Sequence, residues 1–203
     1  MTKQRKLTFD PHYNGHKINT DSESGLACDT RILNAIERTL ETGLQASSKA
    51  LVFRYDVRLP RTIDATSNKV FMSFQADFCK HLNRKGLKPR YVAVREGDSS
   101  TNPHYHVALV LDGQKTQNPY GHLQKAEETL ARKLDLAPEG NHGLIHACDK
   151  DHEGQPQPNS YMVMRNGENY DDAFYRLSYL AKVSTKPSGG RELFVSKCPA
   201  QEK

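Results

Sequence analysis

The segment from residue 90 to residue 111 constrains the fold most, because it has the pattern of a β-hairpin. Residues 90–96 and 104–111 are rich in valine, tyrosine, leucine and other types that occur often in strands. The residues between them, 97–103, read GDSSTNP, and all of these types are common in turns. The segment therefore predicts two neighbouring antiparallel strands, and so a domain built around a β-sheet.

The elements predicted on either side of this hairpin alternate between helix and strand. Asp29 is suited to cap a helix that ends at Gly43, and residues 50–59 form a strand closed by Pro60. The other predicted elements are a helix from 70 to about 86, a helix from 123 to 134, a short strand from 143 to 148, and a helix from 172 to 183. An α+β fold, with an antiparallel central sheet and helices on one face, explains this order most simply.

The chain is long enough for one sizeable core, and we expect a single domain over residues 29–186. Residues 1–28 lack periodicity and predict an N-terminal arm or irregular lead-in. Residues 149–170 are rich in proline, asparagine and glycine and predict a long loop. Residues 187–203 predict a flexible C-terminal tail.

The composition favours a chain that stays in the cytoplasm and binds a polyanion. The four cysteines lie far apart with no CxxC pair, and the amino terminus has no secretory signal, which predicts reduced thiols. No apolar run approaches the roughly twenty residues needed to span a bilayer, so we expect no membrane insertion. The net charge of +5 favours a partner such as nucleic acid, although proteins that bind none often carry a similar excess.

Two histidines in the second hairpin strand form a candidate metal site. Alternate residues of a strand point to the same face, so His104 and His106 share one side of the sheet. Glu96 ends the first strand, where its carboxylate can face the same ion. Two imidazoles and one carboxylate suit a divalent ion with open positions, Mg²⁺ or Mn²⁺ rather than zinc, because no cysteine is near. The alternative is a pair of surface imidazoles on an edge strand.

A second candidate site lies in the last predicted helix. Tyr175, Tyr179 and Lys182 are spaced by four and three residues, so they can form one ridge on a helix. A phenol titrates near 10 in water, so only about one in a thousand is ionised at neutral pH. A metal ion and a neighbouring lysine would let it attack a phosphodiester. The alternative is that the tyrosines pack in a core, although Phe174 and Leu177 already provide an apolar stripe.

Together these motifs resemble the HUH endonucleases, the initiators of rolling-circle replication. The signature of that family is a histidine, a hydrophobic residue and a histidine, followed downstream by YxxK, and here it reads His104, Tyr105, His106, then Tyr179 and Lys182. More narrowly, the segments RYDVRLP at 54–60, VREGDSSTNPHYHVALVLDG at 94–113 and SYLAKVSTK at 178–186 resemble the inovirus-type replication proteins. The resemblance covers roughly residues 30–196.

This resemblance implies a ferredoxin-like or RNA-recognition-motif-like sheet and a DNA-nicking reaction. Tyr179 would attack single-stranded origin DNA, leaving a 5′-phosphotyrosine link and a free 3′-hydroxyl, and the reverse transfer would reseal the product. Glu96, His104 and His106 would hold the divalent ion, and Lys182 would assist the phenolate or the phosphate. The reaction would start replication of a phage, satellite or plasmid in the cytoplasm of a bacterial host.

Some implied roles and partners are left open by the sequence. Tyr175 would be a second nucleophile, or would serve in packing or DNA stacking. No Walker motif is present, so a host helicase would unwind the DNA and a host polymerase would extend it. A non-catalytic module of the same fold that only holds origin DNA is the alternative function. A two-histidine phosphoesterase would need His-x-Thr or His-x-Ser motifs, which the chain lacks.

The basic and aromatic residues near these motifs are candidate DNA contacts. The candidates for phosphate contacts are Arg54, Arg58, Lys69, Arg95, Lys186 and Arg191. Tyr55, Tyr105 and Tyr161 are candidates for base stacking. His142 and His146 are spaced like ligands on a helix, but their segment predicts a strand, so we do not expect a second metal pair there, although His146 can line the active face.

Overall fold

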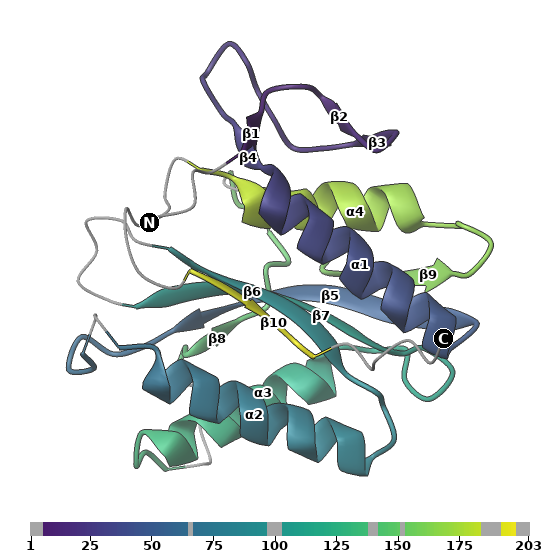
Figure 1. The fold of residues 1–203 in the computed structure, drawn as a ribbon. Helices are drawn as coiled ribbons and strands as arrows, with labels where there is room; N and C mark the ends of the chain where they lie inside the picture. Colours follow the sequence, from purple (N-terminus) through teal and green to yellow (C-terminus); the bar gives the residue numbers. More distant parts are fainter. Residues whose placement is uncertain are drawn as a thin grey trace.

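The computed structural model shows a six-stranded antiparallel sheet with helices on both of its faces (Figure 1). The structure describes residues 6–64, 67–96, 103–137, 142–150, 153–183 and 192–197. The strands of the sheet are β5 (Lys49–Arg58), β6 (Arg90–Glu96), β7 (His104–Asp112), β8 (Ile145–His146), β9 (Ser160–Met164) and β10 (Leu193–Val195). The order across the sheet is β10, β6, β7, β5, and both β8 and β9 pair with the outer edge of β5.

The sheet separates two hydrophobic cores. Helices α1 (Thr30–Ala46) and α4 (Tyr170–Ser178) cover one face, and helices α2 (Lys69–Arg84) and α3 (Tyr120–Lys133) cover the other (Figure 1). In β7, Ala108 and Val110 belong to the first core, whereas Val107 and Leu109 belong to the second. The prediction of helices on one face was therefore wrong. A strand covered on both faces needs a nearly continuous apolar run, which is what β7 has.

The predicted hairpin is confirmed, and its register positions the candidate site. Glu96 of β6 lies opposite His104, and Val94 lies opposite His106. On the other side of β7, Asp56 of β5 lies opposite His106. Paired residues point to the same face of a sheet. The side chains of Glu96, His104, His106 and Asp56 therefore all lie on the face covered by α1 and α4.

Helix α1 begins as predicted but does not end at the predicted glycine. The carboxylate of Asp29 accepts a hydrogen bond of 2.9 Å from the backbone N–H of Arg31, which caps the helix. The helix continues past Gly43 to Ala46. A Cβ at Gly43 would lie 2.5 Å from Cγ1 of Val110, so this glycine allows the helix to approach the sheet closely. By contrast, α2 ends at Arg84, close to Gly86, as predicted.

Several segments predicted as irregular contribute strands. β9 lies within the predicted loop 149–170 and pairs with half of β5, so that prediction was wrong there. β10 forms from the predicted tail and pairs with β6 at the edge of the sheet. Both strands are short and lie among turn-forming residues. The sequence therefore shows no clear period there from which to predict them. The predicted strand at 143–148 is reduced to the two residues of β8.

The described part of the lead-in, from residue 6 onward, contains short two-residue strands and packs on the helices. These strands are β1 (Leu7–Thr8), β2 (His12–Tyr13), β3 (His16–Lys17) and β4 (Cys28–Asp29). Ile18 is buried, and the ring of His16 lies 5.3 Å from the ring of Phe174 in α4. No helix in the described part of the chain is both long and apolar enough to cross a bilayer.

Candidate metal and nucleophile site

Two imidazoles of β7 lie between two carboxylates. Oε1 of Glu96 lies 2.8 Å from Nε2 of His106, and its Oε2 lies 3.3 Å from Nδ1 of His104. Oδ1 of Asp56 lies 2.6 Å from Nδ1 of His106, and its Oδ2 lies 3.6 Å from Nε2 of His104. The structure thus brings together the three predicted ligands and adds a fourth candidate, Asp56. We call these four residues the histidine–carboxylate cluster.

Asp56 was not identified as a ligand from the sequence, although one signal was present. It is a lone carboxylate within the run VFRYDV, residues 52–57 of β5, all of which are buried. A buried carboxylate needs hydrogen bonds or a counter-charge, so its position alone suggests a functional partner. The partner could not be named in advance, because it depends on the pairing of β5 with β7.

The charges of the cluster reinforce one another. Burial acts to raise the pKa of Asp56, but its interactions with His104, His106 and the nearby Arg54 hold that pKa well below its usual range. Burial likewise acts to lower the pKa of His104, but the carboxylates of Asp56 and Glu96 raise it to about 9. The Asp56 carboxylate therefore stays ionised, and the cluster favours a cation between its carboxylates.

The donor atoms of the cluster fit a divalent metal ion. Ligand atoms of Asp56, His104 and His106 all lie within 4.8 Å of one another. The Nε2 atoms of both histidines are buried and make no hydrogen bond to any described residue; the 2.8 Å contact of His106 with Glu96 lacks hydrogen-bond geometry. A buried nitrogen without a hydrogen bond is costly, and coordination to a cation would offset that cost. The Nδ1 of His106 is held by Asp56, which leaves Nε2 available for a metal.

Tyr179 lies against this cluster. It begins the short 3₁₀ turn Tyr179–Ala181 that follows α4, and its ring centroid lies 5.8 Å from that of His106 at nearly a right angle. The guanidinium carbon of Arg54 lies 4.3 Å from the centroid of the Tyr179 ring, and Nζ of Lys182 lies 5.2 Å from it. The predicted nucleophile, the predicted lysine and the predicted metal ligands are therefore neighbours in space.

Tyr175 occupies a different environment. Its side chain is 39% exposed, and Nζ of Lys17 lies 5.4 Å from its ring centroid. The predicted ridge of two tyrosines and a lysine is broken, because α4 ends at Ser178 and the chain tightens into the 3₁₀ turn. Only one of the two predicted nucleophiles, Tyr179, contacts the cluster through its ring.

A basic cavity of about 400 Å³ opens beside Tyr179. Its walls are formed by Asn19, Arg54, Asp56, His146, Cys148, Lys150, Gln157, Arg176 and Tyr179. His146 lines it because β8 places this residue opposite Asp56, on the same face of the sheet as the histidine–carboxylate cluster. Burial raises the pKa of the Cys148 thiol to about 12, so this wall residue is neutral. Three cations around a cavity next to a phenol are suited to hold a phosphate.

The predicted DNA contacts divide into those that remain accessible and those that do not. Tyr105 is fully buried: its ring stacks on Phe71 at 4.0 Å, and its hydroxyl donates to Asn68. It cannot stack on a base in this arrangement, so that prediction was wrong. Tyr55 is also fully buried. These residues point away from the cluster because strand alternation sends them into the core under α2 and α3.

The arginine candidates also differ in their surroundings. Arg54 is only 7% exposed and contacts Asp56 and Tyr179, so it is part of the site rather than a surface contact. Arg95 is partly buried and donates to Asn68, whereas Arg58 at the end of β5 is exposed. Lys186 and Arg191 lie outside the described residues.

The fold and the site define an α+β domain with a candidate metal centre beside a tyrosine. The chain belongs to the YagK/YfjJ family, because the model of the YagK/YfjJ C-terminal domain matches residues 8–194. No curated protein matches the chain, and no solved structure does. The matched range contains the whole histidine–carboxylate cluster as well as Tyr179 and Lys182.

Proposed function

We propose that this protein is a metal-dependent endonuclease of the HUH type, which nicks and rejoins single-stranded DNA through Tyr179. The observation that carries the proposal is the contact between the Tyr179 ring and both His106 and Arg54, next to imidazole nitrogens that make no hydrogen bond to any described residue. A tyrosine that only packed in a core would not need a buried guanidinium over its ring or a basic cavity beside it. We also propose that the central sheet is of the ferredoxin-like type, as in the HUH endonucleases.

The reaction we propose is a transesterification. The phenol oxygen of Tyr179 forms a bond to phosphorus, the bond from phosphorus to the 3′ oxygen breaks, and the phenol proton is balanced by the proton that the 3′ oxygen gains. The products are a 5′-phosphotyrosine and a free 3′-hydroxyl, and the reverse transfer rejoins the strand. A divalent ion, Mg²⁺ or Mn²⁺, held by the histidine–carboxylate cluster would withdraw charge from the phosphate oxygens.

The cations around Tyr179 would assist the attack. Arg54 lies over the ring and is buried, so its charge is poorly screened and would stabilise the negative charge of the transition state of the attack. Asp56 keeps this guanidinium in place through a contact of 3.3 Å. Lys182, on the same ring, would help to neutralise the charge that develops on the phosphate.

We infer from this chemistry that the protein initiates rolling-circle replication of a phage, satellite or plasmid in a bacterial cytoplasm. A nick that leaves a free 3′-hydroxyl supplies a primer, and the covalent link preserves the energy needed to rejoin the strand. A host polymerase and a host helicase would be the partners. This step depends on the nicking activity and on the resemblance of the motifs to the HUH signature.

A covalent adduct tests the proposal. The protein would be incubated with Mn²⁺ and a random single-stranded DNA library that carries a fluorophore at its 3′ end, because the 3′ part of the cut strand stays on the tyrosine. A fluorescent protein band should appear on a denaturing gel and should disappear in Tyr179→Phe and in excess chelator. Tyr175→Phe is the matched control, since it removes the same atom from an exposed tyrosine and should leave the adduct.

The alternative, a non-catalytic module that holds origin DNA, gives a different result. Such a module would bind single strands with the same affinity in wild type and in Tyr179→Phe, and it would form no adduct with any metal. An adduct that persists in Tyr179→Phe would instead move the nucleophile elsewhere, and both outcomes would overturn the role of Tyr179.

A further inference from the structure

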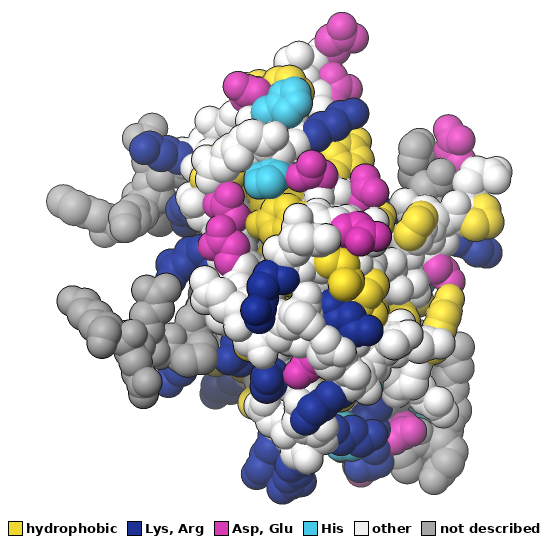
Figure 2. All heavy atoms as spheres, turned by 90° about the vertical axis from the view of Figure 1, so that its right-hand side faces the viewer, with side chains coloured by type: hydrophobic (Ala, Val, Ile, Leu, Met, Phe, Trp, Pro, Cys, Tyr) yellow, Lys and Arg dark blue, Asp and Glu magenta, His cyan; other side chains and the backbone are white. Residues whose placement is uncertain are grey.

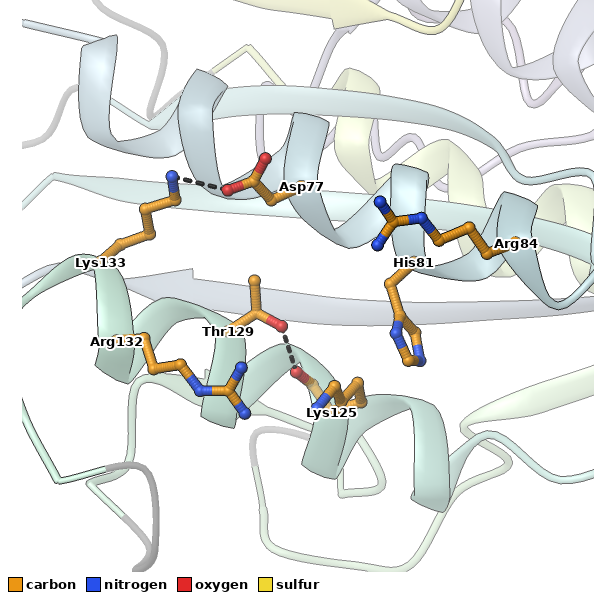
Figure 3. Close-up of a pocket in the computed structure, with 7 residues that line it drawn as sticks. All are labelled: Asp77, His81, Arg84, Lys125, Thr129, Arg132 and Lys133. Atoms are coloured by element: carbon orange, nitrogen blue, oxygen red, sulfur yellow. Dashed lines mark hydrogen bonds and ion pairs between the residues drawn. The ribbon is translucent and has the colours of Figure 1, made fainter.

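A groove of about 370 Å³ lies between α2 and α3 (Figure 3). These helices cover the face of the sheet opposite to α4, the helix that leads into Tyr179 (Figure 1). Asp77, His81 and Arg84 line it from α2, and Lys125, Thr129, Arg132 and Lys133 line it from α3. His81 points from α2 toward α3 in Figure 3. We call this cavity the α2–α3 groove, and none of its residues belongs to the candidate metal and nucleophile site.

Four cations and one carboxylate line the groove, so its net charge is positive. Lys133 pairs with Asp77 at 2.6 Å, and Lys125 and Arg132 both pair with Glu128, at 2.7 and 3.5 Å. Arg84 makes no ion pair or hydrogen bond with any residue in the described part of the chain. Figure 2 shows lysine and arginine gathered over the lower end of the molecule, where α2 and α3 lie, whereas most of the acidic residues in that view lie over the upper half.

The charges around the groove also shift the pKa of His81. Burial and then the charges of Lys85, Lys125 and Arg84 lower the pKa of His81. Cations that repel one another in this way are stabilised by an anion. The local field therefore favours a negatively charged ligand even though part of the charge is already paired.

The chemistry of the lining favours a phosphate backbone over other anionic partners. The residues that line the groove include no phenylalanine, tyrosine, tryptophan, valine, leucine or isoleucine, and its one ring is the imidazole of His81. Protein partners dock mainly on aromatic and apolar anchors, and single strands stack their bases on aromatic rings. A duplex hides its bases and presents only repeated phosphates, which lysine and arginine can contact without reading sequence. The charged ends of Lys125 and Arg132 lie 2.7 and 3.5 Å from the same oxygen of Glu128, so they form one compact cationic group on α3 that can contact a phosphate.

We propose that the α2–α3 groove binds the phosphate backbone of duplex DNA. This surface would hold a double-stranded segment on one face of the sheet while the tyrosine site faces the other way. The inference goes beyond the proposed nicking function, because binding here needs neither Tyr179 nor a metal ion.

The test is the salt dependence of duplex binding by a pair of charge-matched variants. Fluorescence anisotropy with a labelled 20-base-pair duplex would be measured in chelator between roughly 50 and 200 mM NaCl. Arg84→Gln with Lys125→Gln removes two cations of the groove. Lys6→Gln with Arg38→Gln removes two exposed cations from the side of the sheet that α1 covers, with the same change in net charge.

The groove variant should lose affinity and should show a shallower salt slope. Each phosphate contact contributes about 0.9 to the steepness of the plot of log affinity against log salt concentration. One contact therefore makes the affinity at 0.1 M salt roughly eightfold higher than at 1 M salt. Two lost contacts predict a slope smaller by about 2 and a roughly 60-fold weaker affinity at 0.1 M. The control variant should change less than threefold, and the thermal midpoints of both variants should match wild type.

Two results would overturn the inference. Equal losses in the two variants would show that only the overall charge matters. A groove variant that binds duplex like wild type but loses binding to poly-glutamate would assign the groove to an acidic polypeptide instead. The result is independent of the nicking proposal, because the duplex assay contains chelator and Tyr179→Phe should bind duplex as wild type does whether or not adducts form.

Discussion

Asp56→Asn should destabilise the fold because it removes the counter-charge of a buried arginine. The side chains of Asp56 and Arg54 are only 8% and 7% exposed and lie 3.3 Å apart, and the same Asp56 oxygen accepts from Nδ1 of His106 at 2.6 Å. Breaking a buried pair by removing one partner costs about 3–5 kcal/mol, since the remaining charge stays in the interior. For a chain of this size the expected fall in the thermal midpoint is about 6–20 °C.

The pH dependence of this stabilisation follows from the lowered pKa of Asp56. A carboxyl whose pKa is lower in the folded state contributes stability above its unfolded pKa, near 3.9, and loses that contribution as the pH falls through the folded pKa. The full effect should therefore be present at pH 7. Urea unfolding at pH 7 in chelator measures it without a contribution from metal binding.

Two further variants test whether the effect comes from the Arg54–Asp56 pair. Arg54→Met combined with Asp56→Asn should cost less than the sum of the single changes by at least about 1 kcal/mol, because the double variant buries no unpaired charge. Asp171→Asn is the control: its carboxylate pairs with His16 at 2.6 Å, but its side chain is 76% exposed. Exposed pairs contribute at most about 1 kcal/mol. Additive single changes, or an Asp56→Asn variant as stable as the control, would refute the reasoning.

Three other predictions concern the site and its supports. In chelator, stability should fall as the pH rises from about 6.5 through about 9, because His104 has a raised folded pKa and its stabilising charge is then lost; urea midpoints should show this loss in wild type but not in His104→Asn. Gly43→Ala should destabilise by roughly 1–3 kcal/mol in the same assay, because its Cβ would meet Val110 at 2.5 Å, whereas Gly121→Ala in α3 has open space and should be neutral or stabilising. Alkylation followed by mass spectrometry at pH 8 should find Cys148 unmodified in the native protein and modified in urea, because its pKa of about 12 keeps it a thiol; rapid native labelling would contradict this.

The parts of the fold that were predictable are those set by local patterns. The hairpin of β6 and β7 follows from two strand-like runs around a turn, and its register places Glu96 near His104 without any long-range knowledge. The boundaries of α2 follow from its apolar period and Gly86. The closeness of the candidate metal ligands that share this hairpin was therefore predictable from the sequence.

The parts that were missed depend on contacts between distant segments. Asp56 joins the histidines only because β5 pairs with β7, about fifty residues away in the chain. β9 and β10 are strands of five and three residues whose form is imposed by the sheet edges they extend. Helices on both faces were signalled by the continuous apolar run of β7, but that signal does not say which helix covers which face.

The same limit applies to the tyrosines. Spacing alone put Tyr175 and Tyr179 on one helical ridge, but the helix ends between them. The switch to a 3₁₀ turn rotates Tyr179 toward His106 and leaves Tyr175 exposed beside Lys17. A change of helical period over a few residues is set by tertiary packing, and no sequence pattern marks it here.

The most direct test of the central claim is to find which tyrosine carries DNA after reaction with single-stranded DNA and Mn²⁺. Trypsin separates the two candidates, because cleavage after Arg176 and Lys182 releases LSYLAK with Tyr179 alone, whereas Tyr175 stays in the preceding peptide. After nuclease digestion, mass spectrometry should find a nucleotide on LSYLAK, and chelator should abolish it. A nucleotide on the Tyr175 peptide, or on no peptide with any divalent metal, would contradict the account.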